Sequence, residues 1–276
     1  MSYVIFAVLG ALLIGAGAFY RKVALKNIEP SVAALIESTG SAIISWVAVL
    51  LFGVSVSLQH AIWPLAGGFF TFLAIMFVYT ALKTGPVSTI TTIYNLNAVI
   101  AVPLGILLLG ETLNSTASVG ILLSIIVIFL VYSPEKIRGG AWLLHAIGAM
   151  ASFGIMNYFI KSSADLMNPL LGFAILSTST LLFLIVYNAT MKAREIRKVK
   201  SAALKDFAIV SVLLSLGVIS IFRAFALGPL SVVVPIANMN LIPTVFLSAL
   251  VLKEKLDKKT WLAIALALPT VWLLSI

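Results

Sequence analysis

Long, continuously apolar runs follow one another along the chain, and short polar connections separate them. Each run approaches the roughly 20 residues that a helix needs to cross a hydrocarbon core about 30 Å thick. Strands of a membrane barrel would instead alternate apolar and polar residues. The pattern therefore predicts an all-α membrane protein with ten transmembrane helices. The predicted spans are residues 2–20, 31–52, 62–82, 86–109, 116–132, 141–160, 169–190, 207–227, 230–252 and 260–274.

The composition leaves no room for a soluble domain. Of the 276 residues, 62% are hydrophobic and 10% are charged, far from the composition of a soluble globular domain. The formal net charge of +9 does not indicate nucleic-acid binding, because the basic residues lie in the connections between spans. The chain has no cysteine, which excludes disulfides and thiolate metal sites. We expect no metal, no cofactor and no nucleic-acid partner.

The basic residues also predict the orientation of the chain in the membrane. Of the 18 Lys and Arg residues, all except Lys161 and Arg223 lie in the connections that follow odd-numbered spans. By the positive-inside rule these connections are cytoplasmic, and both termini lie outside. We expect a multi-pass protein of the cell membrane.

One stretch of the chain occurs twice. Residues 85–113 contain a Gly-Pro turn, an apolar span with two asparagines in its middle, and a glutamate near the end; residues 228–256 repeat this without a gap. Five spans in each half force equivalent connections onto opposite faces of the membrane. The sequence therefore predicts two inverted five-helix repeats, residues 1–134 and 135–276.

These motifs resemble the drug/metabolite transporter superfamily, in its EamA-like branch of ten-helix transporters. They read Ala-Leu-Lys-Thr-Gly-Pro-Val-Ser at residues 81–88 and Leu-Gly-Glu-Thr-Leu at residues 109–113, with counterparts at residues 224–231 and 254–256. The resemblance implies a secondary carrier of small metabolites that works by alternating access. The chain departs from the family early in the second span, where an arginine is common and this chain has Glu37.

Four asparagines lie midway along the duplicated spans, near the membrane midplane where carriers of this architecture place substrate. Two positions along an unbroken helix are about 200° apart, so one member of each pair would face a cavity. The other would bond to a neighbouring helix. We favour Asn97, which shares a face with Tyr94, and Asn240 for the cavity, and keep Asn95 and Asn238 as candidates.

Two charged residues fall inside predicted spans. Glu37 is the only such carboxylate, and a charge at depth costs about 2.5–3.5 kcal/mol on insertion scales, so it is a functional candidate by default. It could carry a coupled proton, or it could pair with a loop cation near the interface. Arg223 could bind a carboxylate or phosphate of a substrate; alternatively it could snorkel to the membrane surface or pair internally.

Three further polar residues lie near the ends of spans. Asn157, in the sixth span, could add a donor to the cavity. Glu111 and Glu254 occupy equivalent places after the duplicated spans, and we interpret them as capping the helix that starts at Thr116 or bonding to loop amides, rather than acting in transport.

The sequence thus predicts a secondary transporter, an exporter or exchanger of a small metabolite, driven either by proton coupling through Glu37 or by simple exchange. No P-loop is present, which excludes ATP as the direct energy source. A carrier that flips a lipid headgroup is the main alternative. An intramembrane enzyme is the weaker one, since neither histidine has a carboxylate placed beside it. Joining both repeats in one chain makes a monomer sufficient for transport, and a dimer is compatible with the sequence.

Overall fold

The computed structural model describes residues 2–25, 28–131, 140–191, 201–252 and 258–276. Within these ranges the chain forms helices and no strands, and the ten predicted spans are all present as helices. Two of the ten are interrupted. The helices are α1 (Ser2–Ala24), α2 (Pro30–Leu51), α3 (Ile62–Thr84), α4 (Val87–Asn95), α5 (Ala98–Leu109), α6 (Ser115–Val131), α7 (Ala141–Leu166), α8 (Pro169–Met191), α10 (Ser201–Phe225), α11 (Leu230–Ala237), η2 (Asn238–Asn240), α12 (Leu241–Leu252) and α13 (Lys258–Ser275).

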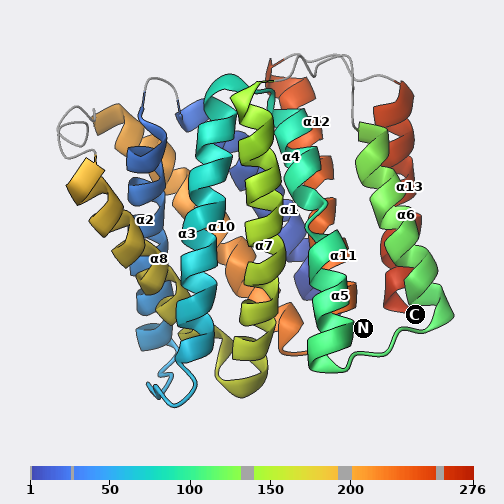
Figure 1. The fold of residues 1–276 in the computed structure, drawn as a ribbon, viewed down its shortest axis with the longest axis horizontal. Helices are drawn as coiled ribbons and strands as arrows, with labels where there is room; N and C mark the ends of the chain where they lie inside the picture. Colours follow the sequence, from blue (N-terminus) through green and yellow to red (C-terminus); the bar gives the residue numbers. More distant parts are fainter. Residues whose placement is uncertain (1, 26–27, 132–139, 192–200, 253–257) are drawn as a thin grey trace.

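The helices run side by side, alternately up and down, and the two termini lie on the same side of the bundle (Figure 1). α1 runs upward in this view and α7 downward, so the two halves have opposite orientations. In the described residues, eight segments are long and apolar enough to cross a membrane, and a shorter apolar helix covers Ser115–Leu130. These features confirm the predicted all-α membrane fold.

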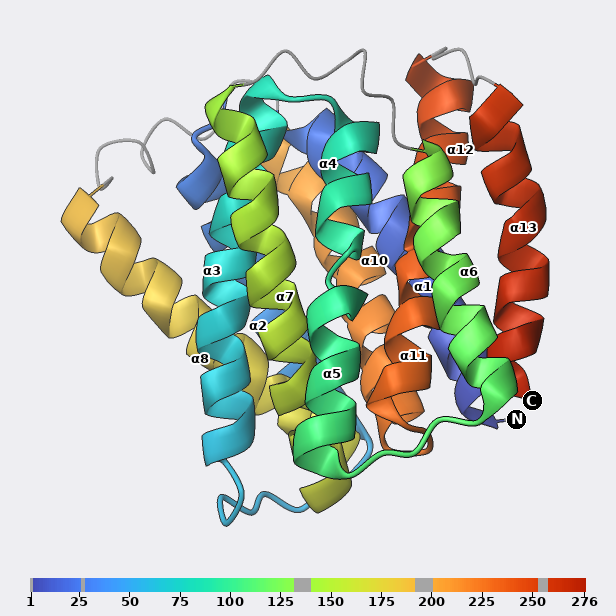
Figure 2. The ribbon, with the colours of Figure 1, turned by 45° about the vertical axis from the view of Figure 1, so that its right-hand side comes forward.

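Most helices pack against a partner from the other half of the chain. α1 packs along α10, α3 along α7, and α2 along α8. α5 meets α11, and α6 and α13 pack together at one edge of the bundle (Figure 2). The pairs α1–α10 and α7–α3 are equivalent under exchange of the two halves. Neither half therefore has a complete core of its own.

The two duplicated spans are each broken at their asparagines. α4 ends at Asn95 and α5 begins at Ala98, whereas the 3-10 turn Asn238–Asn240 separates α11 from α12. α4 and α5 lie one below the other, beside α12 and α11 (Figure 2). The prediction of one continuous helix at each place is therefore wrong at its centre.

Asparagine side chains account for both interruptions. The amide of Asn97 donates to the backbone carbonyl of Tyr94 (2.9 Å), and the amide of Asn240 donates to that of Ala237 (2.9 Å). Such bonds from short polar side chains compete with the helical pattern. Pro243 removes a backbone donor only in the second copy, so the feature common to both breaks is the asparagine.

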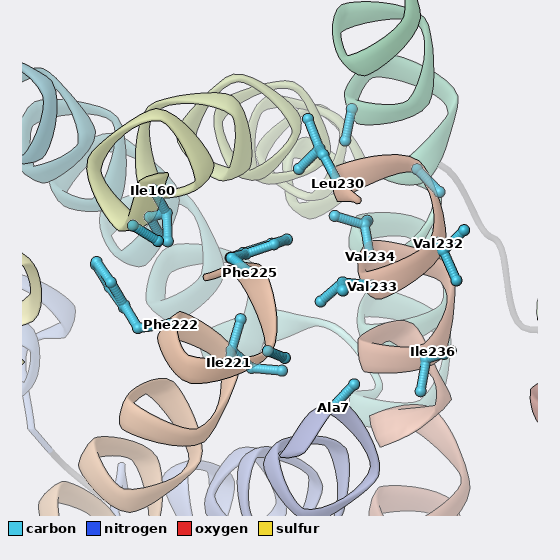
Figure 3. Close-up of a cluster of buried hydrophobic side chains, with 14 of the residues drawn as sticks. Ala7, Ile160, Ile221, Phe222, Phe225, Leu230, Val232, Val233, Val234 and Ile236 are labelled. Carbon is cyan, nitrogen blue, oxygen red and sulfur yellow. The ribbon is translucent and has the colours of Figure 1, made fainter. Parts of the chain in front are cut away.

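Apolar side chains from both halves fill the space around the breaks. Ala7 of α1, Ile160 of α7 and Ile221 and Phe225 of α10 face the run Leu230–Ile236 of α11 (Figure 3). Leucine side chains on the outer faces of the bundle are instead exposed, as expected where the surrounding solvent is hydrocarbon. The most exposed examples are Leu51 (78%), Leu107 (78%) and Leu268 (80%).

Glycines allow the first helix of each half to approach the break in the other half. A Cβ atom built on Gly15 of α1 would lie 2.4 Å from the backbone oxygen of Asn240. One built on Gly154 of α7 would lie 3.1 Å from the backbone oxygen of Asn97. Backbone therefore meets backbone at both breaks, in equivalent positions.

We expect Gly15→Ala to destabilise the protein, because the added methyl group would overlap a backbone atom that a rotamer change cannot move. The expected loss is about 1–3 kcal/mol, the usual cost of overpacking. Denaturant unfolding in detergent measures it. Gly67→Ala is the matched control, since its Cβ would lie 3.2 Å from the end of the Leu176 side chain, which can adjust. Equal stability of the two variants would contradict the close approach at Gly15.

Candidate functional site

A cavity lies between the two halves and is lined by residues of both. Its empty volume, counting the part that opens to solvent, is about 1060 Å³. None of the lining residues comes from α6 or α13, which pack outside it. The polar and charged lining residues are Arg21, Glu37, Ser38, Ser41, Thr71, Tyr94, Asn95, Asn97, Asn157, Ser177, Thr180, Asn238 and Asn240.

The four asparagines of the duplicated spans are hydrogen-bonded to one another across the two halves. The amide of Asn95 donates to Oδ1 of Asn240 (3.0 Å), and Asn240 donates back (3.3 Å). Asn97 and Asn238 exchange the same pair of bonds, each at 3.3 Å. Since Asn95 is the counterpart of Asn238 and Asn97 that of Asn240, the two pairs are equivalent. We call these four residues the asparagine quartet.

All four members of the quartet line the cavity and are buried. The expectation that one asparagine of each pair would face the cavity is therefore wrong. It assumed an unbroken helix, in which residues two apart point in opposite directions. The helix stops at the asparagines, and the turn redirects both side chains of each pair to the same space.

The quartet leaves some hydrogen-bonding capacity unused. An asparagine amide has two N–H donors. Asn97, Asn238 and Asn240 each donate to a backbone carbonyl and to a partner side chain, whereas among the described residues Asn95 donates to Asn240 alone. Asn157 approaches Oδ1 of Asn97 at 3.5 Å, a contact at the outer limit of a hydrogen bond. Asn95 and Asn157 therefore retain donors at the cavity.

A buried ion pair lies elsewhere in the cavity wall. Arg21 of α1 donates through Nε to Oε2 of Glu37 (2.8 Å) and through Nη2 to Oε1 (2.5 Å). Tyr79 of α3 donates its hydroxyl to Oε2 of Glu37 (2.5 Å), and its ring lies 5.6 Å from the guanidinium carbon. Arg21 is 8% exposed and Glu37 is 2% exposed. Arg21 thus balances the charge of the Glu37 carboxylate, and side chains of α1 and α3 hold the carboxylate in place.

Sequence reasoning missed Arg21 because it counted the residue as a loop cation. α1 continues to Ala24, beyond the predicted end at residue 20, and so carries Arg21 inside the helix. Glu37 does pair with a cation, as one alternative had it, but the pair is buried in the cavity wall. An arginine directly after an apolar span, with one carboxylate available in the next span, was the signal that could have found the pair.

The remaining candidates lie in different places. Arg223 is exposed and does not line the cavity. Tyr94 lines it and packs against the ring of Phe153 at 5.4 Å. Lys161 donates to Asp165 (2.5 Å) and to the Phe225 carbonyl (3.0 Å), away from the cavity.

Glu111 connects the two halves at the ends of their broken helices. Its carboxylate accepts hydrogen bonds from the backbone amides of Leu230 (2.5 Å) and Ser231 (2.9 Å), the first residues of α11. A negative charge at this position also suits the helix dipole. Glu111 therefore caps a helix, but the helix is α11 of the opposite half and not the one expected to start at Thr116. Glu254 lies outside the described residues, as does the predicted boundary at residues 134 and 135.

Comparison with known proteins identifies the family. The model of the EamA-like transporter family matches the chain twice, over residues 1–133 and again over residues 140–276. The chain belongs to the EamA-like transporter family. It is therefore a membrane transporter of the drug/metabolite transporter superfamily, built from two repeats.

The wider comparisons support the fold alone. A solved structure described as "Crystal structure of protein" superposes with a TM-score of 0.79 at 14% sequence identity, covering 99% of this chain and 96% of the other. A search of curated proteins gave no significant match. Within the described ranges, no group of three or more His, Asp or Glu residues could hold a metal ion.

We expect the quartet bonds to couple the two halves energetically. In a double-mutant cycle, Asn95→Ala and Asn240→Ala should show a coupling free energy of about 0.6–2 kcal/mol, the range measured for interhelical polar contacts in membranes. Unfolding in detergent measures each variant. Asn114→Ala is the control partner, because Asn114 and Asn95 share no hydrogen bond. Additive effects of Asn95 and Asn240 would show that the bond contributes nothing.

Proposed function

We propose that the protein is a secondary transporter that moves a small metabolite by alternating access, with the central cavity as its substrate site. The observation that carries this proposal is the position of the cavity. Both halves line it, and both helix breaks open onto it with their asparagines. Discontinuous helices that meet between inverted repeats are how many secondary carriers form their substrate sites.

The quartet and its neighbours would orient the substrate. Asn95 and Asn157 retain N–H donors, and Tyr94 adds an aromatic face beside Phe153. The remaining asparagines hold the broken helices together and present carbonyl oxygens. A mostly apolar cavity with a few placed polar groups is the usual form of a small-molecule site.

Glu37 is the proposed proton carrier. It is a buried carboxylate in the cavity wall, within hydrogen-bonding distance of a cation and a phenol. Gain of a proton would cancel its charge and weaken both bonds from Arg21. A proton gradient could in this way change the contacts between α1, α2 and α3 and drive export or exchange.

The remaining parts of the proposal concern assembly and orientation. One chain supplies both repeats, so a monomer suffices. We retain the prediction that the basic connections face the cytoplasm and both termini face outward, in the cell membrane. Arg223, on which the lipid-headgroup alternative depended, does not line the cavity, and our proposal leaves it out of the substrate site.

Alternating access predicts that one cavity position reacts with impermeant reagents from either side of the membrane. The chain has no cysteine, so Thr71→Cys introduces a single thiol into the cavity wall. We expect labelling both in right-side-out and in inside-out vesicles, and slower labelling with bound substrate. Ser124→Cys, at a fully buried position in α6, is the control and should stay unlabelled. Labelling of Thr71→Cys from one side only would contradict alternation.

Proton coupling predicts that Glu37→Gln abolishes uptake driven by a pH gradient while exchange of substrate across the membrane continues. Exchange serves as the internal control for folding, which matters because loss of one partner of a buried pair typically costs about 3–5 kcal/mol. Tyr79→Phe keeps the carboxylate and should retain gradient-driven transport. Transport in proteoliposomes measures all three, and gradient-driven uptake by Glu37→Gln would refute the coupling.

A further inference from the structure

The charged side chains in the cavity wall are one cation and one anion, which face each other. Arg21 and Glu37 are the only charged residues among the described residues that line the cavity. The bonds that the described protein makes to Arg21 use Nε and Nη2. A guanidinium has five N–H donors, so the two on Nη1 remain for a ligand. Arg21 is thus paired with a carboxylate but keeps N–H donors that no described residue uses.

The two members of the pair differ in how they can be separated. Glu37 can lose its charge by taking up a proton, and Tyr79 and Arg21 are already placed beside it. Arg21 cannot lose its charge, because guanidinium does not deprotonate in proteins. A cationic ligand that paired with Glu37 in place of Arg21 would leave a buried, unpaired arginine, which is strongly unfavourable. An anionic ligand that pairs with Arg21 in place of Glu37 leaves a carboxylate, and a proton can neutralise that carboxylate.

We propose that Arg21 is the binding group for a small organic carboxylate, which replaces Glu37 at the guanidinium while Glu37 takes up a proton. This inference rests on the proposed transport function and names its substrate class. Arg21 holds the substrate carboxylate through two parallel N–H bonds, as guanidinium groups do best. One negative charge and one proton enter the cavity together, so the bound state has the same net charge as the empty one.

The rest of the cavity fits a substrate with a largely apolar body. Ile75, Phe153, Met156, Phe173 and Leu176 are among the apolar residues that line the same cavity. These side chains have no hydrogen bonds to offer to a second charged group. A carboxylate at Arg21 with a small aliphatic or aromatic body satisfies both parts of the wall.

Glu37 is the group that takes up the proton in this arrangement. Arg21 of α1 and Tyr79 of α3 face Glu37, and Tyr94 of α4 lies within electrostatic reach of Arg21. From α10 the neighbour is Ser211, which donates to the Glu37 carbonyl, and α8 presents Asn188 to the backbone of α2. Neither of these two titrates. A second carboxylate near Glu37 disfavours its charged form, so anion and proton bind with positive coupling.

The test is binding to the purified protein in detergent with matched probes of three charges. The probes are butyrate, hexanoate, benzoate and phenylacetate, each with its amide and its amine, measured by calorimetry in buffers of different ionisation enthalpy. We expect at least one carboxylate to bind with uptake of about one proton, and its affinity to fall about tenfold per pH unit as the pH rises. Its amide and amine should bind more weakly by on the order of tenfold or more.

Two variants separate the roles of the pair. Glu37→Gln keeps the guanidinium but removes the titrating group, so carboxylate binding should persist without proton uptake and without pH dependence. Arg21→Gln should lose carboxylate binding by on the order of 100-fold, and its thermal unfolding and size-exclusion profile in detergent report whether it is folded. If Arg21→Gln fails to fold, the pH dependence of Glu37→Gln still decides the inference.

Several results would overturn it. Preference for the amines with proton release would assign the site to cations. Preference for the amides, or pH-dependent binding to Glu37→Gln, would contradict the proposal that the substrate carboxylate replaces Glu37 at Arg21. Absence of carboxylate binding while the wild-type protein transports another compound in liposomes would refute this inference and leave the proposed function intact. Absence of transport of any compound would refute the proposed function itself.

Discussion

Backbone groups that are freed inside a hydrocarbon layer must find partners within the protein, because no water is there to bind them. The two broken helices create this need near the centre of the molecule. The amide of Asn238 meets it for the first half by donating to the backbone carbonyl of Asn95 at 2.7 Å. A side chain of the second half thus completes the first break, side-chain bonds of the quartet join the two breaks, and the cavity forms where the two halves meet.

The same requirement determines how the two halves are held. Glycines bring α1 and α7 against the backbone of the opposite break, and Glu111 binds the first amides of α11. Most of the surrounding contact is apolar, whereas these polar contacts are few and directional. In the proposed alternating access, the polar contacts would hold the two halves together beside the cavity while the apolar packing around them rearranges.

The sequence allowed the helix count, the two repeats and their opposite orientation to be predicted, because apolar length and repeated motifs are local signals. It also identified Glu37 and all four asparagines. It failed where tertiary contacts decide the outcome. Two positions along an unbroken helix are about 200° apart, so one asparagine of each pair was assigned to the cavity. No local sequence signal revealed that the helix stops at Asn95. Arg21 looked like a loop charge because its burial depends on Glu37 and Tyr79, which lie on other helices.

The central claim is that the cavity between the repeats binds a small molecule and exposes it to each side of the membrane in turn. Counterflow in proteoliposomes tests this most directly. Vesicles are loaded with an excess of one unlabelled compound from a panel of metabolites, and entry of its tracer is followed without ATP or any ion gradient. We predict a transient accumulation of tracer above its outside concentration for at least one compound, and its loss when Asn95 and Asn240 are both replaced by alanine. Passive equilibration of every tracer by correctly folded protein would contradict the account.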